Sequence, residues 1–385
     1  METDTPSVAE HSRARSFGLP QFVVGMIGLV GALGALVLMR ELGTFLAPMF
    51  LALNLVIAAY PLHAFLVSKG APAWVGATVM ALAVIVILLF AVGAIVWAVN
   101  DMVNVLPEYS AQYSKMINSI IDLIRQFDPD IETTGIMDIL KKIDPNSIVN
   151  VATSLLSQTS AILGGIVVIV ASLIFFAMDT PGFADRVRLS AKSNSHVSQV
   201  LSSFGSGVRR YWLVTSFFGA IIAALDGVAL VILGVPMPMV WVILSFLTNY
   251  IPNVGFVVGL APPALLALLG GGWQKMLALI IVYSVLNFAI QSVIQPRFTG
   301  DAVGINASAS FISLLVWGWV FGGLGALLAL PMTLLVKAVL LDIDPNTKWL
   351  DALVSSNPFP ADKKRTYGKR KKKSVVVAGY EADSE

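Results

Sequence analysis

Residues 239–269 read MVWVILSFLTNYIPNVGFVVGLAPPALLALL, a stretch of 31 residues that is apolar except near its middle. There Pro252 lacks a backbone N–H and clashes with the preceding turn, and Gly255 permits backbone conformations closed to other residues. A second apolar stretch, 309–341, is interrupted by Gly322, Gly323, Gly325 and Pro331. Broken backbone at membrane depth must be buried in protein or line a wet cavity. A pair of interrupted segments is therefore a sequence pointer to a transport site.

The composition of the whole chain indicates a membrane protein. Of its 385 residues, 57% are hydrophobic and 12% are charged, whereas a soluble domain carries about a quarter charged residues. So few polar side chains cannot cover a soluble core, and the long unbroken apolar runs differ from the alternating strands of an outer-membrane barrel. We predict an all-α polytopic membrane protein with about eight hydrophobic membrane segments, two of them broken and each either spanning or forming a re-entrant hairpin. A small extramembrane helical insertion completes the predicted fold.

Apolar and polar stretches alternate along the chain and divide it into seven parts. These are a cytoplasmic arm (1–20), membrane segments 1–3 (21–99), an extracytoplasmic helical insertion (100–150), membrane segment 4 (151–178), a cytoplasmic amphipathic helix (179–210), membrane segments 5–8 (211–341), and a largely disordered cytoplasmic basic tail (342–385). Within the insertion, helical spacing is shown by Tyr113, Ile117, Ile120, Ile121 and Ile124. A second, short helix is expected over 136–143.

The orientation follows from the basic residues, which stay on the cytoplasmic side of a membrane. Eight of the eleven residues 363–373 are Lys or Arg, so the C-terminus is expected in the cytoplasm. This cluster is either a topology anchor or a contact with the anionic headgroups of membrane lipids. We expect no nucleic-acid partner.

Several classes of chemistry have no sequence support. The chain has no cysteine and only three histidines, His11, His63 and His196, which lie far apart, so we expect no metal site and no cofactor. It has no G-x-x-x-x-G-K-[ST] motif, which excludes a P-loop ATPase as the direct driver. The motifs of intramembrane zinc and serine proteases are absent as well. A secondary transporter is therefore favoured over an enzyme.

Amides form the first set of candidate site residues. Asn287, Gln291 and Gln295 recur every four residues and so share one helix face. An amide that faces lipid loses its hydrogen bonds at a cost of a few kcal/mol, so this face must contact protein or a polar cavity. The stripe is either a set of interhelical hydrogen bonds or a path for a polar, uncharged solute. Likewise, Asn249 and Asn253 flank Pro252 and either satisfy freed backbone groups or bind solute.

Charged residues form a second set of candidates. Asp226 is the only carboxylate deep in a predicted membrane segment, and such a residue is a functional-site hypothesis by default. It is a candidate for proton coupling, or else a carboxylate near the outer end of its segment that is paired with a neighbouring helix. Arg297 and Asp301 form either an interfacial ion pair or a gate latch. We assign Gly322, Gly323, Gly325 and Pro331 to the same candidate gate.

The motifs of the second half resemble those of a known family, the autoinducer-2 exporter family of bacterial and archaeal membrane proteins. The stretch 246–255, FLTNYIPNVG, is similar to the family's Ile-Pro-x-x-Gly signature. The resemblance continues through Pro262-Pro263, through 295–304 (QPRFTGDAVG) and through 321–325 (FGGLG), followed by Pro331. The first half matches in its hydropathy pattern only.

The resemblance implies an inner-membrane exporter or permease of about eight spans that forms a homo-oligomer. Some members are described as exporters of autoinducer-2 and others as sodium/proton antiporters, so the family does not fix the substrate. Many members carry an acidic residue shortly before the Pro-Arg motif, where this chain has Asn287, Gln291 and Gln295. This departure favours export of a small polar solute over the alternative, a sodium/proton antiporter on the same scaffold. A third hypothesis is a membrane scaffold that docks envelope proteins through 100–153.

Overall fold

The computed structural model describes residues 20–127, 149–150, 153–154, 159–193, 195–251, 254–295 and 305–342. Its elements are α1 (Gln21–Glu41), α2 (Gly43–Ser68), α3 (Ala73–Val105), η1 (Leu106–Tyr109), α4 (Ser110–Phe127), α7 (Thr159–Ser193), α8 (Ser195–Ile232), α9 (Pro238–Thr248), α10 (Gly255–Asn287), η2 (Phe288–Ile294), α12 (Ala307–Val336) and η4 (Lys337–Asp342). Over these residues the protein is all-helical and has no strand. Six of the described helical stretches are long and apolar enough to cross a membrane. The predicted all-α membrane class is confirmed at this level.

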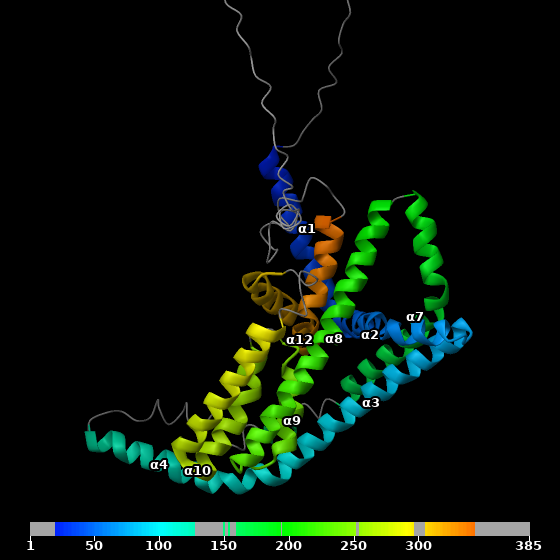
Figure 1. Cartoon of the computed structure of the whole chain (residues 1–385). Helices are drawn as coiled ribbons and strands as arrows, with labels where there is room; N and C mark the ends of the chain where they lie inside the picture. The colour runs from blue at the N-terminus through cyan, green and yellow to red at the C-terminus, as the bar shows by residue number, and fades with distance from the viewer. Residues whose placement is uncertain are drawn as a thin grey trace, which may run out of the picture.

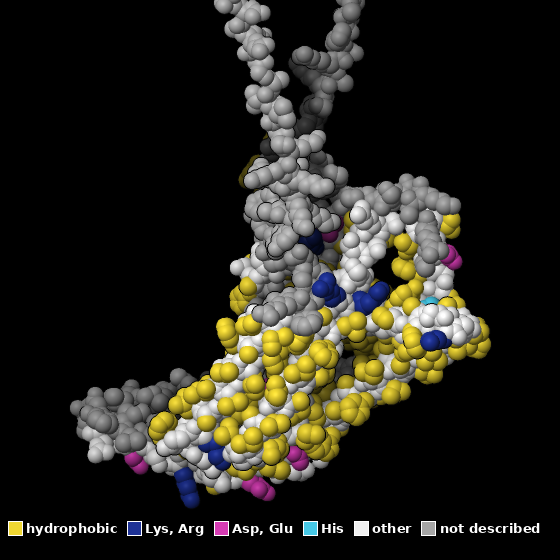
Figure 2. Space-filling view, viewed as in Figure 1, with side chains coloured by type: hydrophobic (Ala, Val, Ile, Leu, Met, Phe, Trp, Pro, Cys, Tyr) yellow, Lys and Arg dark blue, Asp and Glu magenta, His cyan; other side chains and the backbone are white. Residues whose placement is uncertain are grey.

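Large apolar side chains face outward along these helices. Val86, Ile87 and Phe90 of α3 are each more than 60% exposed, and Figure 2 shows hydrophobic side chains spread over much of the visible face of the helices. Soluble proteins rarely expose apolar patches of this extent. Such a surface is suited to contact with the lipid tails of a bilayer.

The helices α3, η1 and α4 follow one another along one edge of the molecule (Figure 1). In α4, three residues at four-residue spacing, Tyr113, Ile117 and Ile121, are buried against Leu265 and Leu269 of α10. The apolar face expected on the helix of the insertion therefore packs against α10, an apolar helix of the same chain. The second helix expected over 136–143 lies outside the described residues.

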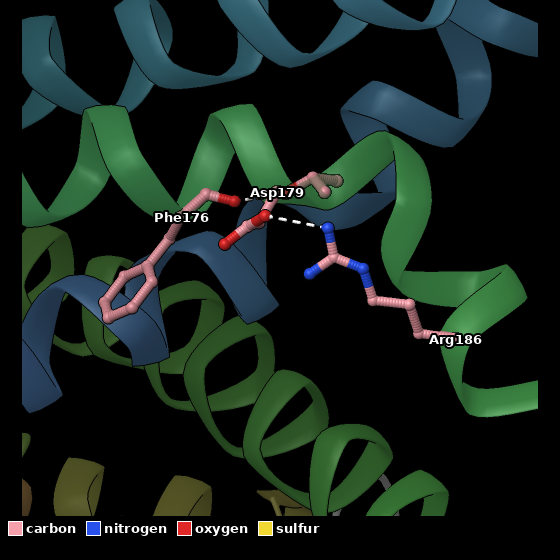
Figure 3. A network of polar contacts seen from close by, with 4 residues as sticks. Phe176, Asp179 and Arg186 are labelled. Atoms are coloured by element: carbon pink, nitrogen blue, oxygen red, sulfur yellow. Dashed lines mark hydrogen bonds and ion pairs between the residues drawn. The ribbon is translucent and has the colours of Figure 1, made fainter. Parts of the chain in front are cut away.

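Residues 179–210 do not form a helix of their own. They are the end of α7 and the start of α8, which run 35 and 38 residues and form an arm that stands apart from the other helices (Figure 1). Inside α7, the Arg186 guanidinium pairs with the Asp179 carboxylate two turns away, at 3.1 Å (Figure 3). Helix α7 continues through Pro181 and Gly182 at the start of the polar stretch, and α8 runs without a proline from Ser195 into its apolar half.

The interrupted stretch 239–269 doubles back on itself. Helix α9 ends at Thr248, and α10 begins at Gly255. The two helices lie antiparallel: Gly255 approaches the carbonyl of Thr248, and one turn later a Cβ at Gly259 would come 3.5 Å from the Cα of Ser245, one turn earlier in α9. Gly272, with φ at 78°, then reverses the chain into the second half of α10. We call α9 together with residues 255–271 the first hairpin.

The second interrupted stretch also forms a hairpin, which consists of α12 reversed at Gly322 with φ at 62°. Its two halves pack through polar side chains. The Ser313 hydroxyl donates to the Ala329 carbonyl at 2.8 Å, and the Trp317 indole N–H donates to the Thr333 hydroxyl at 3.3 Å. We call α12 the second hairpin. Gly322, Gly323, Gly325 and Pro331, the candidate gate residues on this stretch, all belong to it.

Replacing Gly325 by alanine is expected to destabilise the second hairpin by about 1–3 kcal/mol, the usual cost of overpacking. A Cβ at Gly325 would overlap the Trp317 carbonyl group on the opposite half. Gly323→Ala is the matched control, because a Cβ there meets nothing within 4 Å. Thermal unfolding of both variants in detergent measures the difference, and equal stabilities would contradict the close approach of the two halves.

Candidate functional site

A polar pocket lies inside the apolar helices, where the first hairpin meets α8 and the end of α10. Its walls are formed by Asp226, Ser245, Thr248, Asn249, Gly255, Phe256, Gly259, Tyr283, Asn287 and Gln291. The pocket has about 210 Å³ of space free of atoms when its open mouth is counted, but the enclosed part has room for about one water molecule. In this conformation it is a buried polar site whose inner part is too small for a solute larger than water.

Asp226 contributes the carboxyl group of the pocket from α8. Its side chain is fully buried, and its Oδ2 accepts a hydrogen bond of 2.7 Å from the Ser245 hydroxyl of α9. The other oxygen, Oδ1, has no hydrogen-bond partner among the described residues. The carboxyl group thus links α8 to the first hairpin through one oxygen and leaves the other available to the pocket.

Asn249 joins three elements at the tip of the first hairpin. Its Nδ2 donates to the Thr215 carbonyl of α8 at 3.2 Å, and its Oδ1 accepts from Gln291 Nε2 at 2.9 Å. Gln291 also donates to Asn287 Oδ1 at 2.9 Å, and Asn287 donates to the Tyr283 carbonyl. Gln291 lies in η2, a π-helix, and such segments occur frequently at functional sites. These amides therefore close the pocket between the hairpin tip and η2.

The polar walls offer oxygen and amide groups but little charge. Within the described residues, no group of three or more His, Asp or Glu side chains could hold a metal ion. Hydroxyls and amides donate and accept hydrogen bonds at the same time. The arrangement suits a polar, uncharged molecule or a proton better than a multivalent ion.

Comparison with known proteins identifies the family. The family model described as AI-2E family transporter matches residues 26–344, which is most of the chain. The chain belongs to the AI-2E transporter family. This family consists of transporters rather than enzymes, so the expectation that the chain is not an enzyme is confirmed, and a transported solute is implied.

Curated relatives match this AI-2E protein along most of their length. A putative transport protein of Haemophilus influenzae is 26% identical over 344 residues, covering 86% of this chain and 95% of the relative. The AI-2 transport protein TqsA of Escherichia coli is 26% identical over 330 residues, covering 83% and 94%. The putative transport protein YhhT of Escherichia coli is 23% identical over 290 residues, covering 75% and 82%. The AI-2E protein is thus a multi-pass membrane protein with bacterial relatives.

The structure brings together five of the transport-path candidates. The pocket walls include Asp226, Asn249, Gly255, Asn287 and Gln291. Gln295 follows η2 one turn beyond Gln291 and is not among the wall residues. The remaining path candidates, Pro252 and Asn253, lie outside the described residues of the AI-2E protein.

The gate candidates do not line this pocket. Gly322, Gly323, Gly325 and Pro331 lie in the second hairpin, whose core residues belong to a separate cluster with α2 and α8. Arg297 and Asp301 lie outside the described residues. The pocket geometry of the AI-2E protein therefore does not test the gate hypothesis, which stays a prediction.

Sequence reasoning missed five wall residues: Ser245, Thr248, Phe256, Gly259 and Tyr283. Two of them carried a usable signal. Tyr283 lies four residues before Asn287 and extends the polar stripe by one turn, and Ser245 lies four residues before Asn249 on α9. Thr248, Phe256 and Gly259 carry no comparable pattern, because only the doubling back of the chain places them at the pocket.

Proposed function

We propose that this AI-2E family protein is a secondary transporter that exports a small, polar, uncharged solute across the bacterial inner membrane. Autoinducer-2 is the first candidate solute, because the name of the relative TqsA assigns AI-2 transport to it. The observation that carries the proposal is the buried polar pocket between the first hairpin and α8. Buried hydrogen-bonding groups inside a membrane protein are costly unless they are satisfied, so a site of this kind supports a transport role.

Transport through this site requires the first hairpin to move. The enclosed space admits about one water molecule, so a larger solute enters only if the Asn249 tip separates from Gln291 and Thr215. Interhelical hydrogen bonds in membranes contribute about 0.6 kcal/mol each. A few such bonds are weak enough to be exchanged for bonds to a solute, which makes the tip a suitable gate.

The proposed topology has eight apolar segments. The chain crosses at α1, α2, α3, α7, α8 and the second half of α10 with η2, while both hairpins enter and leave on one side. This arrangement keeps both termini in the cytoplasm, with the insertion that contains α4 outside. We further propose that the basic cluster 363–373 contacts anionic lipid headgroups and that the protein forms a homo-oligomer, as its family resemblance implies.

Gln291→Leu is expected to reduce autoinducer-2 export by about tenfold or more, which corresponds to about 1.4 kcal/mol. The substitution removes both hydrogen bonds that Gln291 makes across the pocket. Efflux of autoinducer-2 from proteoliposomes that contain the full chain measures the rate. Thr78→Val is the matched control, because Thr78 is exposed on α3 and bonds only the carbonyl of Trp74 in its own helix.

A wild-type protein that moves no autoinducer-2 would reject this solute, and a panel of other neutral polar solutes would then be assayed in the same vesicles. Export at the wild-type rate by Gln291→Leu would show that the pocket is not on the transport path.

The second candidate function is a sodium/proton antiporter, favoured by the one carboxyl group, Asp226, in the pocket wall. The scaffold hypothesis has less support, because the apolar face of α4 already packs against α10.

A further inference from the structure

Two fully buried side chains of the pocket each hold a polar atom without a partner. Asp226 on α8 is 0% exposed and Tyr283 on α10 is 1% exposed. Within the part of the chain that the structure describes, Asp226 Oδ1 and the Tyr283 hydroxyl both lack hydrogen-bond partners, and both residues line the same pocket. Buried polar groups are nearly always satisfied, so this pair points to an occupant that supplies hydrogen bonds to both.

Among the described residues, the pocket wall holds no positively charged side chain that could balance a carboxylate at Asp226. Besides Asp226 itself, the described charged side chains on α8, α9, α10 and η2 are Arg209, Arg210 and Lys275. Arg209 lies four to five turns away along α8 and donates to the Ile57 carbonyl, while Lys275 donates to the Gly234 carbonyl beyond the end of α8. The titratable side chain that shares the pocket with Asp226 is Tyr283. An ionised carboxylate without a counter-ion is very costly to bury, so it must bind a cation whenever the pocket is closed.

The inner part of the pocket is too small for a hydrated metal ion. The enclosed space admits about one water molecule, which leaves no room for a hydrated metal ion. A proton on Asp226 Oδ1 needs no additional ligands. It converts this oxygen into a hydrogen-bond donor toward a single water, which can accept that bond and in turn bond the Tyr283 hydroxyl.

We propose that Asp226 is the proton-binding group of this transporter and that the Tyr283 hydroxyl positions the bound proton across the pocket. The inference rests on the proposed transport function and names its coupling ion. Hydronium gives up a proton as its O–H bond breaks and an O–H bond forms at Oδ1 before the hairpin packs over the site, and water takes the proton back from Oδ1 when the first hairpin opens. Because Ser245 of the hairpin binds the same carboxyl group, the protonation state of Asp226 acts directly on the element that must move.

Infrared difference spectroscopy of the purified full-length protein tests this assignment without a transported solute. A protonated carboxyl group shows a C=O stretching band that disappears on ionisation. We expect one such band to be lost reversibly as the pH rises, to be absent from Asp226→Asn, and to persist in Asp179→Asn, whose carboxylate is exposed on α7. In Tyr283→Phe the band should remain but move in frequency, because the polar group across the pocket from Oδ1 is removed.

Three results would overturn the proposal. They are the absence of any band that depends on Asp226, a band that does not change with pH, and loss of the band when sodium chloride replaces choline chloride at constant pH. The last result would assign a sodium site to the same pocket. Since the spectrum needs no solute, a titrating band in a protein that moves no autoinducer-2 would reject the proposed solute and keep the proton site. Autoinducer-2 export without such a band would reject the proton site alone.

Discussion

Gly255→Ala is expected to abolish export and to lower the free energy of unfolding by about 3 kcal/mol, the upper end of the usual cost of overpacking. A Cβ at Gly255 would overlap the carbonyl group of Thr248, the last residue of α9. That carbonyl accepts a hydrogen bond of 2.8 Å from the Ile251 N–H in the tip of the first hairpin. The alanine methyl group therefore forces the two arms apart at the point where Asn249 closes the pocket.

Gly270→Ala is the matched control for this variant, because Gly270 lies in the same helix and a Cβ there meets nothing within 4 Å. It should keep nearly wild-type stability and export. Thermal unfolding in detergent and autoinducer-2 efflux from proteoliposomes, measured on both variants, separate the structural effect from the transport effect. Normal export by a stable Gly255→Ala protein would show that the close approach of the two arms has no role in the path.

The break in 239–269 could be predicted because its cause is local. A proline and a glycine inside an apolar run cannot continue a regular helix, and the structure ends α9 at Thr248 and restarts at Gly255. Whether each broken segment crosses or turns back remained open, since hydropathy does not record direction. The turning back depends on contacts between residues 14 to 16 positions apart, such as Ser245 with Gly259 and Ser313 with Ala329.

The candidate site was predicted in part for the same reason. The four-residue spacing of Asn287 and Gln291 is a local pattern that indicates a shared face. Their partner Asn249, 42 residues before Gln291, could be singled out only as a polar residue beside the break. The role of Gly272 in reversing the chain was not predicted, because its positive φ depends on how the first hairpin packs.

Ser245→Ala is expected to destabilise the protein by about 1–3 kcal/mol, the cost of leaving a buried polar group unsatisfied. The Ser245 hydroxyl is the only hydrogen-bond donor to Asp226 in the described residues, and Asp226 Oδ1 already lacks a partner. The exposed Ser114, whose hydroxyl bonds the Ser110 carbonyl of its own helix, provides the control Ser114→Ala. Thermal unfolding in detergent gives the stabilities of the wild type, Ser245→Ala and Ser114→Ala.

The double variant Ser245→Ala with Asp226→Leu should recover most of this loss, because replacing both partners of a buried hydrogen bond by apolar groups is nearly neutral for stability. Its export should nevertheless be lost, since the pocket no longer holds a carboxyl group. Separating stability from export in this way distinguishes a functional carboxyl group from a structural one. If the double variant were less stable than Ser245→Ala alone, Asp226 would contribute to the fold through contacts other than this hydrogen bond, and its assignment to the transport site would lose its main support.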